Sequence, residues 1–301
     1  MHQPTSGTTV TLEPASGPTF AELAHQHGLA VSGARPGLGA YLKQVWSRRH
    51  FIWTYANARL IATYTNARLG QIWQVLTPLA NAGVYFLVFG LLLGTDRGIG
   101  NFIGYLCTGI FIFTFTQQTV STAARSIADN LNLIRAMHFP RVSLPLTTVL
   151  VQVQQMLPTM GVLVVIMLAT GEGIDLSWLL VVPALLLQTL FSAGLAMMVA
   201  RWAARTSDLS QLLPFVMRTW LYASGVFYSI DRFTADLPGW VSTVLQFNPM
   251  AVYINVVRYA LMDSMGTTPG YLWPAAAGWA LVMGVTGFIY FWRAEEEYGR
   301  G

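Results

Sequence analysis

Six apolar segments, each about as long as a membrane-crossing helix, limit what this chain can fold into. They lie near residues 74–94, 101–121, 146–169, 178–200, 211–229 and 271–292. A helix rising about 1.5 Å per residue needs about 20 apolar residues to cross roughly 30 Å of hydrocarbon, and it satisfies its own backbone hydrogen bonds there. In the whole chain, 54% of residues are hydrophobic and 10% are charged. The sequence therefore predicts an all-α integral membrane protein with six transmembrane helices.

Basic residues gather in the loops on one side of the predicted helices. Arg125, Arg135, Arg141, Arg201 and Arg205 fall on that side. Because arginine and lysine in short loops stay in the cytosol, we expect a multi-pass protein of the bacterial cytoplasmic membrane with both termini cytosolic. The positive charge follows these loops and forms no separate basic and aromatic patch, so nothing indicates a nucleic-acid partner.

The chain before the first apolar segment divides into two parts. Residues 1–36 are rich in Pro, Gly, Ser and Thr and lack the pattern of a signal peptide, so they predict a disordered cytosolic tail. Residues 37–70 contain apolar residues at spacings of three and four between positions 41 and 64. This pattern predicts an amphipathic helix in the membrane interface, with its basic side toward the headgroups. Residues 71–301 would form the transmembrane domain.

The segment at about 230–270 is too long for a tight turn. Its two apolar pieces, 240–247 and 250–262, are too short to cross a membrane, and Asn248 and Pro249 separate them. We expect two short helices that re-enter the membrane from outside before the last span. A plain extracellular loop with two surface helices is the alternative.

The chain carries no recognisable energy source. Its only lysine, Lys43, does not stand in a phosphate-binding loop, and the six segments hold no aspartate or glutamate of the kind that ion-coupled carriers keep within the membrane. The histidines lie outside the segments without the spacing of metal ligands. The sequence therefore predicts a transport subunit with no catalytic site, no metal and no cofactor of its own, and with energy supplied by another chain.

A cytosolic loop at about 125–145 has the features expected of a contact with that partner. Its end reads RAMHFPRVSLP, in which arginines flank an apolar side chain and prolines end one helix and begin the next span. We hypothesise that the coupling residues are Arg135, His138, Phe139, Pro140 and Arg141. An ordinary positive-inside loop would explain the arginines, but not the phenylalanine or the prolines.

These features resemble the ABC-2 type permeases that export lipid-linked polysaccharides such as O-antigen, teichoic acid and mycobacterial galactan. Three motifs carry the resemblance over roughly residues 41–293. They comprise Leu69, Gly70, Trp73 and Pro78; then Leu133, Ile134, Arg135, Phe139, Pro140, Arg141, Leu144 and Pro145; and finally Asn248, Pro249 and Arg258.

The resemblance implies a homodimer of permeases with two ATPase subunits, which would bind the ATP and Mg²⁺. It implies a glycan on a polyprenyl pyrophosphate as substrate, moved along a channel through the membrane lipids. The re-entrant helices would form an extracellular gate that includes Asn248, Pro249 and Arg258.

Aromatic side chains suit such a channel because sugar rings present C–H faces to them. The candidates are Tyr85, Phe89, Tyr105, Phe111, Phe115, Trp220, Tyr222 and Tyr228. Helix packing or a belt at the lipid interface would explain many aromatics equally well. Arg218 stands about 13 Å into the fifth segment, where an unpaired arginine is costly. We hypothesise that it attracts the lipid pyrophosphate; a structural arginine is the alternative.

Two rival functions remain at this stage. An ABC-2 exporter of a lipophilic drug or of a lipid would share the same fold. A membrane-bound glycosyltransferase or phosphotransferase is disfavoured because the segments lack carboxylates.

Overall fold

The computed structural model describes residues 37–65, 72–92, 99–137, 139–206 and 208–295, all of which fall in the compact unit Arg35–Gly301. Its helices are α2 (Leu38–Ser47), α3 (Arg49–Thr65), α4 (Ile72–Tyr85), η1 (Phe86–Leu92), α5 (Phe102–Ala124), η2 (Ala128–Asn130), α6 (Leu131–Ala136), α7 (Ser143–Ala169), η3 (Leu176–Leu180), α8 (Val181–Arg205), α9 (Asp208–Ala223), α10 (Ile230–Phe233), α11 (Gly239–Gln246), α12 (Pro249–Leu261), η4 (Asp263–Met265) and α13 (Leu272–Arg293). No strand occurs among these residues. The predicted tail 1–36, together with Leu69, Gly70 and His138, lies outside the described residues.

A helix occupies each of the six apolar segments. Three are long and apolar enough to cross a membrane, namely α7, η3 with α8, and α13. The prediction of an all-α membrane protein is thereby confirmed, whereas the number of crossings stays a prediction. The predicted extent of the fifth segment, 211–229, is wrong, because α9 ends at Ala223. The chain then turns through Gly225, whose φ of 62° suits a residue without a side chain.

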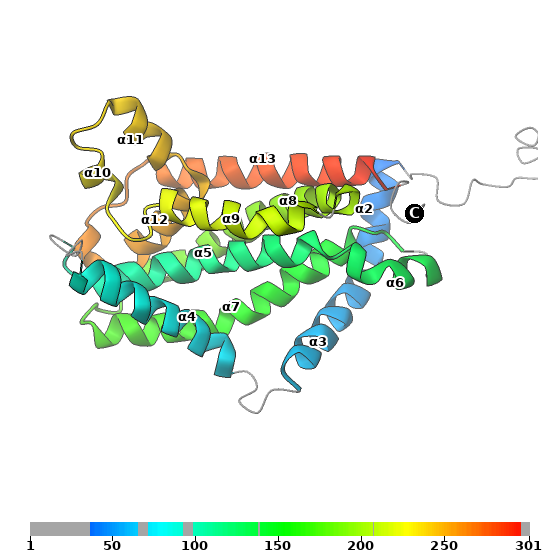
Figure 1. Ribbon diagram of the computed structural model, residues 1–301, viewed down its shortest axis with the longest axis horizontal. Coiled ribbons are helices and arrows are strands. Elements are labelled where there is room, and N and C mark those ends of the chain that lie inside the picture. The colour runs from blue at the N-terminus through cyan, green and yellow to red at the C-terminus, as the bar shows by residue number, and fades with distance from the viewer. Residues whose placement is uncertain (1–36, 66–71, 93–98, 138, 207, 296–301) are drawn as a thin grey trace, which may run out of the picture. The chain divides into compact units, whose positions relative to one another are not determined.

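Helices α8 and α13 pack along most of their lengths (Figure 1). Glycines make this approach possible: a Cβ on Gly194 would lie 2.0 Å from the carbonyl oxygen of Met283, and one on Gly287 would lie 2.2 Å from the carbonyl oxygen of Gly194. Small residues commonly bring membrane helices into such close contact. The last helix is therefore fixed against α8 by backbone contact.

Polar side chains join α5 to α8 within the buried layer. Gln188 donates through Nε2 to the carbonyl oxygen of Ile112 at 2.7 Å and to Oγ1 of Thr116 at 3.0 Å, and Thr116 shares a hydrogen bond with Ser192 at 2.9 Å. Because these groups are buried, each hydrogen bond avoids the cost of an unpaired polar atom in an apolar setting. The bonds fix the register of α5 against α8.

The predicted interface helix at 41–64 is two helices, because α2 ends at Ser47 and α3 begins at Arg49. Trp46, Trp53 and Ile61 remain 71%, 54% and 66% exposed. Helix α3 also packs on α7, and its Tyr55 donates to Asn130 of η2 at 2.6 Å. This arrangement leaves apolar side chains for lipid, as an interface location requires.

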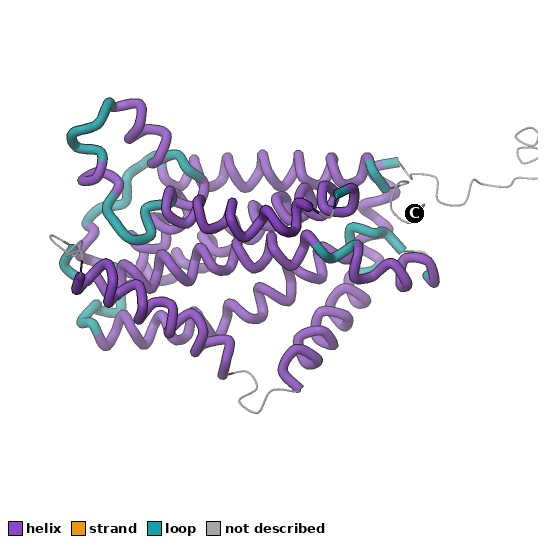
Figure 2. The backbone as a smooth tube through the Cα atoms, in the orientation of Figure 1, coloured by secondary structure: helices purple, strands orange, loops and turns teal. Residues whose placement is uncertain are grey.

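The loops gather at the two ends of the long helices (Figure 2). Helices α2 and α6 lie at one end, and α10 and α11 project from the other (Figure 1). The short helix α12 packs between α5, α8 and α13. The coupling loop and the segment before the last helix therefore lie at opposite ends of this unit.

Candidate functional site

A cavity of about 360 Å³ lies between α4, α5 and α7. Amide groups, hydroxyl groups and aromatic rings face it. Its lining consists of Trp73, Thr77, Pro78, Asn81, Phe111, Thr114, Phe115, Gln117, Gln118, Gln152, Gln155, Met156 and Thr159. None of these side chains carries a charge. We call it the glutamine cavity after the glutamines in its lining. An uncharged lining of amides and hydroxyls suits a neutral ligand that is rich in hydroxyl groups.

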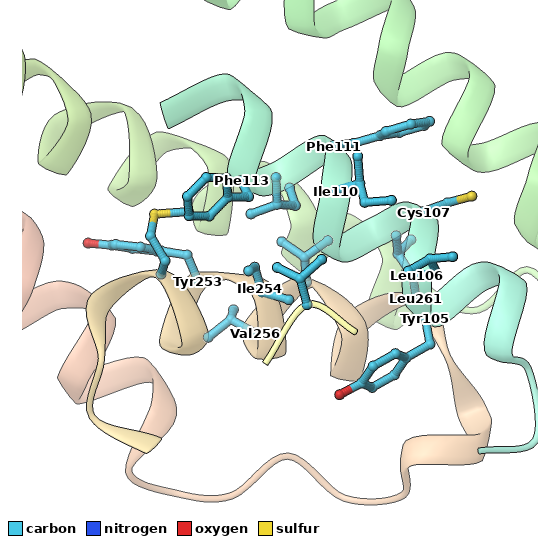
Figure 3. Close-up of a cluster of buried hydrophobic side chains, with 14 of the residues drawn as sticks. Tyr105, Leu106, Cys107, Ile110, Phe111, Phe113, Tyr253, Ile254, Val256 and Leu261 are labelled. Carbon is cyan, nitrogen blue, oxygen red and sulfur yellow. The ribbon is translucent and has the colours of Figure 1, made fainter. Parts of the chain in front are cut away.

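Two predicted channel aromatics, Phe111 and Phe115, border this cavity, although each is otherwise buried. Figure 3 shows Phe111 on the side of α5 that faces away from α12. Trp73 and Pro78, which belong to the first motif, lie on the opposing wall. The glutamines were missed at the sequence level, although a primary amide within an apolar span is costly unless it has a partner.

Three further channel candidates surround one aromatic residue. Tyr85 lies 4.7 Å from the ring centroid of Phe227, Phe89 stacks on the same ring at 4.5 Å, and Tyr222 approaches it at 5.6 Å. Phe227 is itself 1% exposed. Phe227 lies in the turn after α9 and was not among the aromatic residues proposed for the channel. These aromatics connect α4 and η1 to the end of α9.

Arg218 is exposed on α9, close enough to Tyr85 to act on it electrostatically. The buried residues of α9, Leu213, Met217 and Leu221, form a stripe, and Arg218 lies about 100° of helical rotation from its centre. Arg218 therefore stands at the edge of the buried side of α9, with its own side chain exposed.

Asn248 and Trp220 join the start of α12 to the end of α9. Asn248 accepts the Met250 backbone N–H at 3.1 Å and thereby caps α12, while Pro249 takes the first helical position. The same amide accepts from Trp220 Nε1 at 2.8 Å and donates to the Ala223 carbonyl oxygen at 3.0 Å. The Asn-Pro motif thus begins α12 and attaches it to the end of α9 by hydrogen bonds.

Arg258 is 1% exposed and holds α12 to the turn after α9. It donates to the carbonyl oxygens of Tyr105, Gly225 and Val226 at 2.9 to 3.2 Å. Its guanidinium also lies 3.2 Å from the ring centroid of Tyr105. The Tyr105 hydroxyl donates to the carbonyl oxygen of Tyr228 at 2.9 Å. Figure 3 shows Tyr105 directed away from the apolar layer between α5 and α12. Tyr105 therefore takes part in the contacts by which Arg258 joins α5, α12 and the turn after α9.

The coupling loop is helical, as its sequence predicts, with α6 at its centre. Arg135 is exposed at the end of α6, and Pro140 is buried. Phe139 is half-buried, with its ring 5.6 Å from that of Phe51 on α3, so part of its apolar surface is covered within the chain. Met137 is instead 45% exposed and offers the apolar contact that a partner would cover.

Arg141 contacts the chain's own last segment. Its backbone N–H donates to Oε1 of Glu295 at 2.8 Å, and its guanidinium donates to the Glu295 carbonyl oxygen. Tyr41 of α2 donates to Oε2 of the same carboxyl at 2.6 Å. Burial raises the pKa of Glu295 above its usual range, and the bonds from Arg141 and Tyr41 oppose that rise. No sequence pattern links these residues, so this clamp was missed.

The long apolar helices and the uncharged cavity between α4, α5 and α7 define the class as a multi-pass membrane protein. Comparison with known families makes this specific. The profile of the ABC-2 type transporter family matches residues 50–262, so the chain belongs to that family. It is a transporter's membrane subunit, the kind of chain that works with an ATPase subunit.

Three curated relatives align with similar extents. Two proteins of Klebsiella pneumoniae, each described as an O-antigen export system permease protein RfbA, are 26% and 24% identical, over 69% of this chain and 78% and 79% of their own lengths. A Myxococcus xanthus protein of the same description is 22% identical over 69% of this chain and 79% of its own length.

Proposed function

We propose that this chain is the permease of an ABC exporter that moves a lipid-linked polysaccharide outward across the bacterial cytoplasmic membrane. The similarity to O-antigen export permeases over 69% of the chain carries this proposal. A separate ATPase would supply ATP, Mg²⁺ and hydrolysis, so no catalytic or cofactor site is needed here. The glycan could be a galactan, an O-antigen or a teichoic-acid-like polymer.

The lining of the glutamine cavity supports a glycan over a lipophilic drug. Gln117, Gln152 and Gln155 present amides that both donate and accept, as sugar hydroxyls do. Phe111 and Trp73 add ring faces for sugar C–H groups. An apolar drug in this cavity would leave the amides of Gln117 and Gln152 without a hydrogen-bond partner in the ligand, at a cost of about 1–3 kcal/mol each.

The outer face of α9 supports a second permease copy at a shared channel. Leu212, Phe215 and Arg218 are all exposed there. An arginine facing hydrocarbon would cost about 3 kcal/mol or more, whereas one lining a water-filled path between two permeases would not. A guanidinium there could also hold the pyrophosphate of the lipid carrier at the entrance. The exporter would then comprise two permeases and two ATPases.

In this proposal the six helices cross the membrane and both termini face the cytosol. Helices α10 to α12 then belong to the outer side, with α12 re-entering between α5, α8 and α13 and forming part of the gate. Arg135, Met137 and Phe139 would receive the motion of the ATPase at the cytosolic end.

Export can be tested by expressing the permease with its ATPase and measuring polysaccharide on the surface and lipid-linked glycan inside. We expect Gln155→Leu to reduce surface polysaccharide and raise the internal pool. The matched control is Gln154→Leu, because Gln154 lies on the same helix and donates instead to Asn57 of α3 at 2.6 Å. If expression conferred drug resistance and no polysaccharide reached the surface, drug export would replace polysaccharide export as the proposed function.

The role of Arg218 has a separate test. Arg218→Gln should abolish the stimulation of ATP hydrolysis by the lipid-linked pyrophosphate and leave basal hydrolysis of the intact complex unchanged. Unchanged stimulation would rule out the pyrophosphate role.

A further inference from the structure

A second cavity, of about 330 Å³, lies at the end of the helices where α10 and α11 project. Three tyrosines, a carboxylate and two primary amides face it. These residues are Tyr105, Tyr259, Tyr271, Asp231, Gln246 and Asn255. We call it the tyrosine cavity. It shares no lining residue with the glutamine cavity, so it is a separate site.

The polar groups of the tyrosine cavity are brought together from distant segments. Asp231 of α10 accepts a hydrogen bond from Nε2 of Gln246, the last residue of α11, at 2.6 Å. Its charge is close enough to act on Tyr259 of α12 and on Tyr271 before α13. The carboxylate is therefore held in place by α11 and lies among the tyrosines that line the cavity.

Several groups in this cavity have hydrogen-bonding capacity left over. Asn255 accepts from Arg258 Nη1 through Oδ1 at 3.3 Å, and among the described residues its Nδ2 donates to nothing. The hydroxyls of Tyr259 and Tyr271 likewise have no hydrogen-bond partner in the described part of the chain. Polar groups in a cavity are normally paired with protein, water or ligand. The unpaired amide and the two phenols thus form a set of donors and acceptors around one space.

The chemistry of this set selects a neutral ring that carries hydroxyl groups. A carboxylate accepts two hydroxyl hydrogens, an amide or a phenol can donate to a hydroxyl oxygen, and tyrosine rings pack against C–H groups. Asp231 is balanced in the lining by the neighbouring Arg232, so the cavity as a whole favours neither an anion nor a cation. A volume of about 330 Å³ is enough for a sugar residue.

We propose that the tyrosine cavity binds one sugar unit of the exported glycan at the end of the permease opposite the coupling loop. The inference rests on the proposed function for the origin of that sugar. It adds a second sugar site that the growing or leaving chain would occupy beyond the glutamine cavity, with Asp231, Asn255, Tyr259 and Tyr271 as its contacts. Two such sites along one path would hold successive parts of a polymer.

The test is saturation-transfer NMR on the full permease–ATPase complex in nanodiscs. The probes are the methyl glycosides of galactopyranose, galactofuranose, mannose, rhamnose and N-acetylglucosamine, with glycerol as a polyol without a ring. We expect transfer to the ring protons of at least one glycoside and none to glycerol. Asp231→Asn and Tyr259→Phe should each weaken binding by about fivefold or more, the effect of losing one hydrogen bond.

Asp236→Asn is the matched control, because Asp236 is exposed in the same segment and does not line the cavity. The melting temperature of each variant complex shows whether it is folded. The variants are compared in a Gln152→Leu background, which weakens the glutamine cavity, so that its own binding of sugars does not mask the result. The proposal is overturned if no glycoside receives saturation in this background, or if the signal there is as strong in both tyrosine-cavity variants as without them. Measuring surface polysaccharide from the same wild-type complex tests the proposed function separately. Export without glycoside binding would refute only the sugar site in the tyrosine cavity. Glycoside binding without export would refute the proposed export function.

Discussion

Replacing Arg258 with lysine should remove hydrogen bonds that hold the turn after α9 and so lower the stability of the complex. Arg258 makes hydrogen bonds to the carbonyl oxygens of Tyr105, Gly225 and Val226 from one planar group. A lysine keeps the charge but offers a single ammonium that cannot span three carbonyls in two segments. If two of these charge-assisted bonds are lost, at about 1.5–3 kcal/mol each, the variant loses about 3–6 kcal/mol.

Thermal unfolding of the purified permease–ATPase complex, followed by tryptophan fluorescence, measures this loss. At about 2–4 °C per kcal/mol, the melting temperature should fall by about 6 °C or more. Arg293→Lys provides the control, since Arg293 is exposed at the end of α13. An Arg258→Lys complex that melts with the wild type, while Arg293→Lys does the same, would refute the reasoning that this fork holds the turn in place.

Three further outcomes are expected. Because burial raises the pKa of Glu295, the folded state holds its proton more tightly than the unfolded state. Wild-type stability should therefore decline as pH rises from the ordinary glutamate range through the raised pKa, and Glu295→Gln should show no such decline when melting is measured against pH. Gly287→Val should prevent accumulation of the complex, because its Cβ would lie 2.2 Å from the Gly194 carbonyl oxygen. Gly278→Val on the same helix is the control, because its Cβ meets nothing within 4 Å. Equal levels of both variants on immunoblots would contradict the close packing of α8 on α13. Met137→Ser and Phe139→Ala should each leave the complex assembled but lower export and coupled ATP hydrolysis, and normal export by both would remove the coupling role of this loop.

The long helices could be predicted because their signal is local. The apolar runs of α7 and α13 are sufficient to define them, and Asn248 with Pro249 marks the start of α12 through a cap and a helix-initiating proline. The end of α9 could not be found this way. Val226 and Phe227 continue its apolar run, yet they lie in a turn that Arg258 buries. Apolarity reports burial, and a buried turn looks the same in the sequence as a helix.

The contacts of the coupling loop depend on residues far along the chain. Phe139 stands among arginines, and the sequence alone does not tell whether its apolar partner belongs to another protein or, as here, to Phe51 of the same chain. Glu295 meets Tyr41 across 254 positions, a separation that no periodic pattern covers. The glutamines were in principle detectable, since amides in apolar segments need a reason. Which of them meet around one cavity follows only from how α5 and α7 pack.

The clamp of Tyr41, Arg141 and Glu295 gives the permease a mechanical property. It joins α2, the coupling loop and the residue that follows α13 at one point, and α13 is in turn held to α8 by its glycines. A force on the coupling loop is therefore transmitted to α2 and α13 together. Helix α4, which borders the glutamine cavity, and helix α9, which carries Arg218, contribute no residue to this clamp. Movement of the clamped elements would therefore change their position relative to α4 and α9, and with it the space beside the glutamine cavity and Arg218.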